Sequence, residues 1–369
     1  MDNEILRHFE SLPDHRQEVK ILHPMRNIVF IVLVGAFNGL DGWEELADFA
    51  EYRRDFFGKY LDLSNGLPSD DTLRRFFAAL DSRAFSECFR KWAASIVPET
   101  DGKTVCIDGK RIRKASTMAD DPIHIVSAWV SENQITLAQL KVGDKTNEIT
   151  AIPQLLEILD LRKATVTIDA MGCQTDIAKK IKEADADYIL AVKDNQPTLM
   201  EEVLDTARTL TPDCVFEETD FGHGRIEERK YMMYSDLSYV LGRERWEGLR
   251  MVVRVETRQI VKKTGAESLD VRHFITSHGI KDAERVKNGI RNHWGVESMH
   301  WQLDVVYDED SCLKRMRNSA ENFNIIRKIV MGALRNDGID YGKKCVSLKR
   351  RMLRASRDDG YLETLLGRL

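Results

Sequence analysis

Between residues 104 and 192, short runs of strand-forming residues alternate with helical patterns in the order β-β-β-α-β-α-β. Three meandering strands followed by two helical crossovers imply a mixed sheet whose faces are covered by helices. We therefore predict an α/β domain. The strands are expected at 104–108, 123–130, 135–142, 164–169 and 188–192, and the helices at 147–159 and 176–183.

The segments on either side of this core follow other patterns. Apolar residues recur at helical spacing through 28–38, 43–57 and 73–96, and Ser69 or Asp70 could cap the helix that begins near Thr72. Runs rich in Val, Tyr, Phe and Thr at 214–219, 226–234, 250–261 and 269–276 are typical of antiparallel strands, and helical periodicity returns at 282–304 and 320–334. These patterns divide the chain into an N-terminal helical domain (1–98), the first part of a core (99–210), a β-rich insertion (211–280), the last part of the core with an acidic helix (281–335) and a basic tail (336–369).

Charge is distributed unevenly along the 369 residues. Residues 311–369 carry 14 Lys and Arg against 6 Asp and Glu, whereas the first 310 residues carry 41 against 54. A basic end on an acidic body can contact phosphates, or it can be a solvated helical surface, and charge alone favours the second interpretation.

Cysteines and apolar runs indicate the class of protein. The six Cys are scattered without a CxxC pair, which argues against a disulfide scaffold or a zinc ribbon and fits a reducing compartment. The first 20 residues are charged throughout, unlike a secretory signal, and the longest apolar run, 28–37, is too short to span a bilayer. We therefore expect a cytoplasmic protein that does not bind membranes.

Two carboxylates end predicted strands of the core. Asp108 follows the run TVCI, and Asp169 follows TVTI, each before a small residue. Ligands bind at the carboxyl ends of strands in open sheets, so two neighbouring strands ending in Asp would bring two negative charges together unless a cation lies between them. Hard oxygen ligands without a nearby Cys favour Mg²⁺ or Mn²⁺. The alternative is that each Asp only caps the turn that follows its strand.

A third carboxylate, Glu297, lies in the predicted helix 291–304. At helical spacing it belongs both to an apolar stripe with Trp294 and Trp301 and to a polar stripe with His293 and His300. Glu297 is therefore expected to face the body of the protein, where it needs a cation or a strong donor, such as Arg291 or Arg315, and the two Trp are expected in the core. His293, Glu297 and His300 could instead hold zinc, but the two His are seven residues apart rather than four as in the zinc-protease motif.

Basic clusters follow two of the strands. Lys110, Arg111 and Arg113 come after Asp108, and Lys193 follows the last core strand. All would lie at the rim of the predicted crevice, where they could contact phosphates, although a solvated loop explains each cluster taken alone.

Taken together, these segments resemble the DDE transposases of bacterial insertion sequences, in particular the H-repeat-associated proteins found with Rhs elements. The resemblance covers nearly the whole chain, and several separated motifs occur in the same order. They are PSDDTLRRF (68–76), IDGKRIRKA (107–115), VTIDAMGCQ (166–174), VKDNQPTL (192–199), HGRIEER (223–229) and RNHWGVESMHWQLDVVYDED (291–310).

The resemblance implies an RNase H-like catalytic core, interrupted by a β-rich insertion, with the triad Asp108, Asp169 and Glu297. It also implies Mg²⁺ or Mn²⁺ as cofactor and double-stranded DNA, both element ends and target, as partner, with a possible homodimer on the DNA. We expect phosphate contacts from the basic residues near these motifs: Lys110, Arg113, Lys193, Arg291, Lys314 and Arg315.

Two positions depart from the pattern of the wider superfamily, Tyr-x2-Arg-x3-Glu-x6-Lys. Its Arg position holds His293 here, and its Lys position holds Asp304, so the phosphate contacts of those residues do not carry over.

In the expected mechanism Asp108 bridges two ions, and Asp169 and Glu297 each hold one. Water would attack a phosphodiester bond at the element end, and the freed 3′-OH would then attack target DNA. A decayed transposase that binds DNA without cutting it is the alternative.

Overall fold

The structure is a computed structural model that describes residues 7–9, 12–14, 16–114, 122–143, 147–222, 224–342 and 346–368. Ala115 and His223, which belong to two of the motifs, and Cys345 lie outside the described residues.

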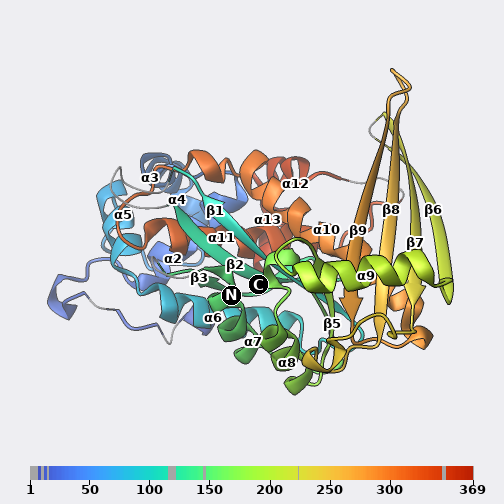
Figure 1. The fold of residues 1–369 in the computed structure, drawn as a ribbon. Coiled ribbons are helices and arrows are strands. Elements are labelled where there is room, and N and C mark those ends of the chain that lie inside the picture. Colours follow the sequence, from blue (N-terminus) through green and yellow to red (C-terminus); the bar gives the residue numbers. More distant parts are fainter. Residues whose placement is uncertain are drawn as a thin grey trace.

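The N-terminal part of the described chain is helical (Figure 1). Helix α2 is apolar all round and buried along nearly its whole length, which makes it the centre of this layer. The predicted helix 73–96 is two helices, because the Asp81 side chain accepts hydrogen bonds from the N–H groups of Arg83 and Ala84 and starts a new helix there. Ser69 caps the preceding helix by accepting from the Thr72 N–H, as expected. The helices are α2 (Met25–Phe37), α3 (Trp43–Tyr52), α4 (Arg54–Gly58), α5 (Asp70–Ala79) and α6 (Ser82–Ile96).

A nine-stranded mixed sheet runs through the molecule in the order β3-β2-β1-β4-β5-β9-β8-β7-β6. Strands β1, β4 and β5 are parallel neighbours, and the other pairs are antiparallel. The predicted order of elements along the chain, β-β-β-α-β-α-β, is confirmed for 104–192, and with it the mixed α/β class. The strands are β1 (Thr104–Ile112), β2 (Ile123–Val130), β3 (Ile135–Lys141), β4 (Thr165–Ile168), β5 (Asp187–Val192), β6 (Cys214–Gly222), β7 (Arg225–Tyr234), β8 (Met251–Val261) and β9 (Glu267–Thr276).

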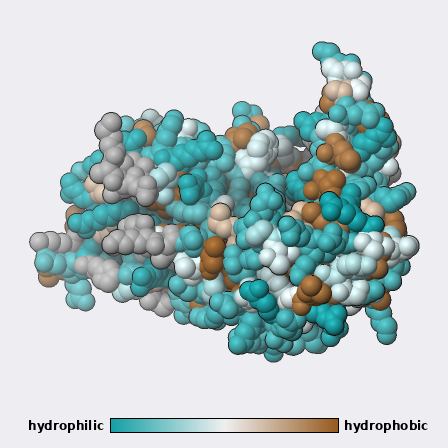
Figure 2. Space-filling view, viewed as in Figure 1, coloured by the Kyte–Doolittle hydropathy of each residue, from teal (hydrophilic) through white to brown (hydrophobic). Residues whose placement is uncertain are grey.

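The strands predicted at 214–276 extend the same sheet, because β9 pairs with β5 from Ile189↔Thr276 to Val192↔His273. Strands β6 to β9 are long and rise beyond the body of the molecule as an arm (Figure 1). The face shown in Figure 2 is mostly hydrophilic, and its most visible apolar residues run along this arm. Exposed apolar side chains there include Val215, Phe221 and Leu269.

Helices cover both faces of the core strands. Helices α7 (Glu148–Glu157) and α8 (Thr175–Glu183) pack against β2, β3 and β5, and α10 (Ala283–Val305) packs across β1, β4 and β5. Side chains alternate between the faces of a strand, and Asp108 of β1 approaches His300 of α10 while the next residue, Gly109, abuts Glu148 of α7. Helices α7 and α10 therefore lie on opposite faces.

Three helices were not predicted. Helix α9 (Pro197–Thr209) begins with Pro in its first turn and buries Leu199 and Val203. Beyond α11 (Ser319–Arg335), the basic segment 336–369 forms α12 (Leu348–Ala355) and α13 (Asp359–Leu366), which bury apolar side chains such as Met352 and Leu362. Its basic residues therefore lie on a folded surface. Among the described helices none has the length and apolar character needed to cross a membrane.

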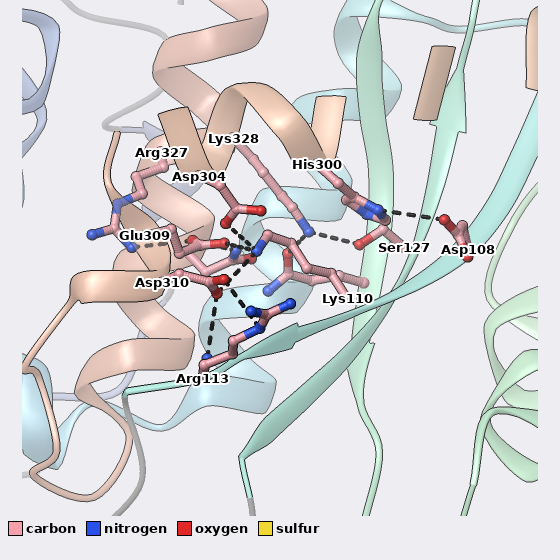
Figure 3. A network of polar contacts seen from close by, with 12 residues as sticks. Asp108, Lys110, Arg113, Ser127, His300, Asp304, Glu309, Asp310, Arg327 and Lys328 are labelled. Carbon is pink, nitrogen blue, oxygen red and sulfur yellow. Dashed lines mark hydrogen bonds and ion pairs between the residues drawn. The ribbon is translucent and has the colours of Figure 1, made fainter. Parts of the chain in front are cut away.

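Lys328 of α11 lies in the core. Its Nζ donates to Ser127 Oγ at 2.7 Å (Figure 3) and to Gln139 Oε1, also at 2.7 Å. Burial lowers the pKa of Lys328 from its ordinary value of 10.5 to about 7. The folded protein therefore loses this proton at a lower pH than the unfolded chain does.

This difference predicts a pH dependence of stability. Between about pH 7 and pH 10 the unfolded chain binds the Lys328 proton and the folded protein does not, so the free energy of unfolding should rise with pH. Lys328→Met lacks the proton and should lack this rise. Urea unfolding of both proteins at pH 7, 8 and 9 measures this rise in the free energy of unfolding. If the free energies of the two proteins change equally with pH, Lys328 titrates normally.

Candidate active site

Asp108 and Asp169 lie side by side on the two parallel strands β1 and β4. The last pair in the register is Ile107↔Ile168, so each Asp follows directly, Asp108 within β1 and Asp169 just past the end of β4. Asp108 does not end its strand as predicted, because β1 continues to Ile112 by pairing with β2. The Gly109 N–H donates to Asp108 Oδ1 at 2.8 Å. Asp169 precedes the short helix η2 (Ala170–Gly172). Burial raises the pKa of its carboxyl, and hydrogen bonding from the backbone N–H groups of Gly172 and Met171 offsets part of this rise, so Asp169 also interacts with the turn that follows its strand.

Glu297 reaches the same place from helix α10. A cavity of about 470 Å³ is lined by Asp108, Asp169 and Glu297, together with residues of β5, β9 and α10. Three carboxylates from distant parts of the sequence therefore surround one hollow. Glu297 faces this hollow, on the side of the body of the protein as expected, but the residue remains exposed, which corrects the expectation that it is shielded from water.

The acids influence one another electrostatically. Burial raises the pKa of Asp169, and the negative charges of Asp108 and Glu148 raise it further. Burial and the charge of Asp108 likewise raise the pKa of Glu297. Burial also opposes ionisation of Asp108, but hydrogen bonding and charge from His300, with smaller contributions from His293 and Gly109, lower its pKa overall. The acids are thus close enough to repel, which a bound cation would relieve.

The donor chemistry suits a hard divalent ion, since the three side chains offer only carboxylate oxygens. Within the described ranges, no group of three or more His, Cys, Asp or Glu side chains is close enough to hold a metal ion. The carboxylates surround the cavity without forming a closed ligand set.

The two histidines of α10 have separate partners. His293 Nδ1 lies 2.9 Å from Thr167 Oγ1, and His300 Nδ1 lies 3.4 Å from Asp108 Oδ2. The zinc alternative built on His293, Glu297 and His300 would require both histidines to leave these partners.

The tryptophans of α10 are not in the core as predicted. Trp301 is 59% exposed. Trp294 is half-buried and lines the cavity, and the guanidinium carbons of Arg229, Arg291 and Arg272 lie 4.9, 5.0 and 5.6 Å from its ring centroid. This cation–π cluster was missed in the sequence, because only the pairing of β7 with β8 and of β8 with β9 brings Arg229 and Arg272 to α10.

Two of the predicted phosphate-binding residues line the cavity. Lys193 is exposed there, and Arg291 pairs with Asp220 at 2.9 Å. Arg113 and Arg315 are exposed on the surface near the end of β1, where Arg315 donates to the Lys114 carbonyl.

The other two predicted phosphate contacts, Lys110 and Lys314, are buried. Lys110 Nζ lies 2.5 Å from Asp304 and near Glu309 and Asp310 (Figure 3). Lys314 pairs with Asp41 and lies over the rings of Trp43 and Phe323. Their charges are matched inside the protein, so the prediction that Lys110 and Lys314 contact phosphates is wrong.

Comparison with known proteins agrees with this arrangement. Residues 99–331 match the family described as Transposase DDE domain, and residues 6–93 match the family described as DDE_Tnp_1-associated. The chain is 35% identical to the H repeat-associated putative transposase YhhI of Escherichia coli (strain K12), over 98% of this chain and 97% of that protein. It is 37% identical to Putative transposase YncI of Escherichia coli O157:H7, over 98% and 94% of the two chains. A shorter match, 35% identical over 19% of this chain and 84% of the other protein, is Inactive transposase YbfQ of Escherichia coli (strain K12). With its mixed sheet, its flanking helices and its match to the transposase domain over most of its length, the chain belongs to the DDE transposase family, whose fold is RNase H-like.

Proposed function

We propose that this chain cuts a DNA strand at the end of a mobile element and joins the freed end to target DNA, with Asp108, Asp169 and Glu297 as its catalytic acids. The observation that supports this most is that these acids, from β1, β4 and α10, line one cavity. Two Mg²⁺ or Mn²⁺ ions held by them would activate the attacking oxygen and stabilise the leaving oxygen. The negative charge of Asp108 raises the pKa of both Asp169 and Glu297, so Asp108 is the acid that would bridge the ions.

The basic residues around the cavity would hold the DNA backbone. Lys193 and Arg272 line it beside the acids, so they could contact phosphates on either side of the cut. We further propose that the N-terminal helical segment and the surface of α12 contribute phosphate contacts, and that two copies of the chain bring two element ends together.

Incubation of the purified protein with duplex DNA carrying the ends of its own element tests this proposal. We expect strand nicks at the element end with Mg²⁺ or Mn²⁺ and none with EDTA. A protein that binds this DNA but never nicks it with either ion would favour the alternative, an inactive DNA-binding derivative.

Salt dependence tests the electrostatic part of the proposal. Binding of the element end should weaken steeply with salt, because each Lys or Arg on a phosphate releases counterions. Replacing the exposed Arg113 and Arg315 by Gln should reduce the slope of log K against log[salt] by about two. Lys179→Gln on α8, also exposed, serves as the control. Fluorescence anisotropy between low and high salt measures the slopes, and an affinity independent of salt would refute phosphate contact.

A further inference from the structure

A fourth carboxylate lies next to the proposed catalytic acids. Glu148 is in the first turn of α7, which is capped by the side chain of Asn147. Its side chain is only 12% exposed, and its Oε1 lies 2.7 Å from Nε2 of His124 on β2. The first turn of α7 thus holds the carboxyl group of Glu148 against strand β2.

Gly109 shows how close this group is to Asp108. A Cβ at position 109 would lie 2.2 Å from Glu148 Oε1 and 2.6 Å from His124 Nε2, so the carboxyl of Glu148 occupies the space that a side chain would need. The N–H of the same residue donates to Asp108 Oδ1. The backbone of Gly109 therefore lies between the two carboxyl groups, which approach it from opposite faces of the sheet.

Glu148 also acts on the second acid. Its negative charge is one of the causes that raise the pKa of Asp169, after burial and the charge of Asp108. Helix α7 also packs against η2, which follows Asp169, so Glu148 lies next to the Gly109 backbone and near the Asp169 turn. A half-buried cluster of like charges costs free energy unless a cation joins it.

We infer that Glu148 is a fourth carboxylate of the divalent-ion site, oriented by His124 and approaching from the α7 face while Glu297 approaches from the α10 face. This inference rests on the proposed function. His124 would hold one carboxyl oxygen and leave the other for the ion or its water, the arrangement by which outer partners orient metal ligands. Gly109 is small because a larger residue would push this carboxylate away.

Mn²⁺ binding by the full chain without DNA tests the inference, with free Mn²⁺ measured by electron paramagnetic resonance. Glu148→Gln keeps the size of the side chain and should weaken Mn²⁺ binding about tenfold or more. Glu157→Gln, at the other end of α7 where the residue is exposed and paired with Lys180, should bind as the wild type does. Asp108→Asn is measured in parallel.

The outcomes separate the two proposals. If Asp108→Asn loses Mn²⁺ binding and Glu148→Gln keeps wild-type affinity, the inference is overturned and the proposed function stands. A lower melting temperature of Glu148→Gln in metal-free buffer, with unchanged affinity, also overturns it and indicates a structural ion pair with His124. If neither substitution changes Mn²⁺ binding, the proposed function fails as well.

Discussion

Replacing Asp108 by Asn should lower Mg²⁺-dependent cleavage of an element end by about a thousandfold or more. Loss of a carboxylate that holds the ions removes several kcal/mol of transition-state stabilisation, and each 1.36 kcal/mol is a factor of ten in rate. The same result is expected for Asp169→Asn and Glu297→Gln, because the three side chains line one cavity. Single-turnover cleavage of a labelled duplex gives the rates.

The matched control is Asp194→Asn, a carboxylate that lines the same cavity but lies outside the triad. It should keep cleavage within a few-fold of the wild type. All variants should still bind the DNA, since none loses a positive charge. A triad variant that cuts at the wild-type rate is not a catalytic acid.

Replacing Arg327 by Met should have the largest effect on stability. Arg327 is 1% exposed, lies 3.1 Å from Glu309 and also pairs with Asp41. Glu309 is fully buried, so removing the guanidinium leaves a buried carboxylate short of a partner and should cost about 3–5 kcal/mol of unfolding free energy. Urea unfolding measures this cost.

A second substitution distinguishes this cause from lost packing. Removing the buried charge as well, in Arg327→Met with Glu309→Gln, should recover part of the stability. Arg54→Met breaks an exposed pair with Glu51 and should change stability by less than about 1 kcal/mol. A cost below about 1 kcal/mol for Arg327→Met would show that the buried network contributes little.

The core of the site could be predicted from the sequence because its signals are local. An apolar run that ends in Asp identifies Asp108 and Asp169, and the alternation of strands and helices makes their strands parallel neighbours. The helical stripe containing Glu297 identifies a helix that lines the cavity, although not the exposure of Glu297 to solvent.

Features that depend on distant contacts could not be predicted in the same way. Lys110 and Lys314 look like surface cations in the sequence, and only the tertiary structure brings Asp304 and Asp41 to them. Likewise, the sequence near Trp294 does not indicate a contact with Arg229 or Arg272. These two residues lie on β7 and β9, and only strand pairing brings them to the Trp294 ring.

A crystal structure of the protein soaked in Mn²⁺ would show whether these three acids hold divalent ions in one pocket. Anomalous scattering locates the ions independently of the protein atoms. We expect peaks in the cavity, about 2.1 Å from carboxylate oxygens of Asp108, Asp169 and Glu297. Saturating Mn²⁺ without a peak between these side chains, or with Glu297 turned out of the cavity, would contradict this expectation.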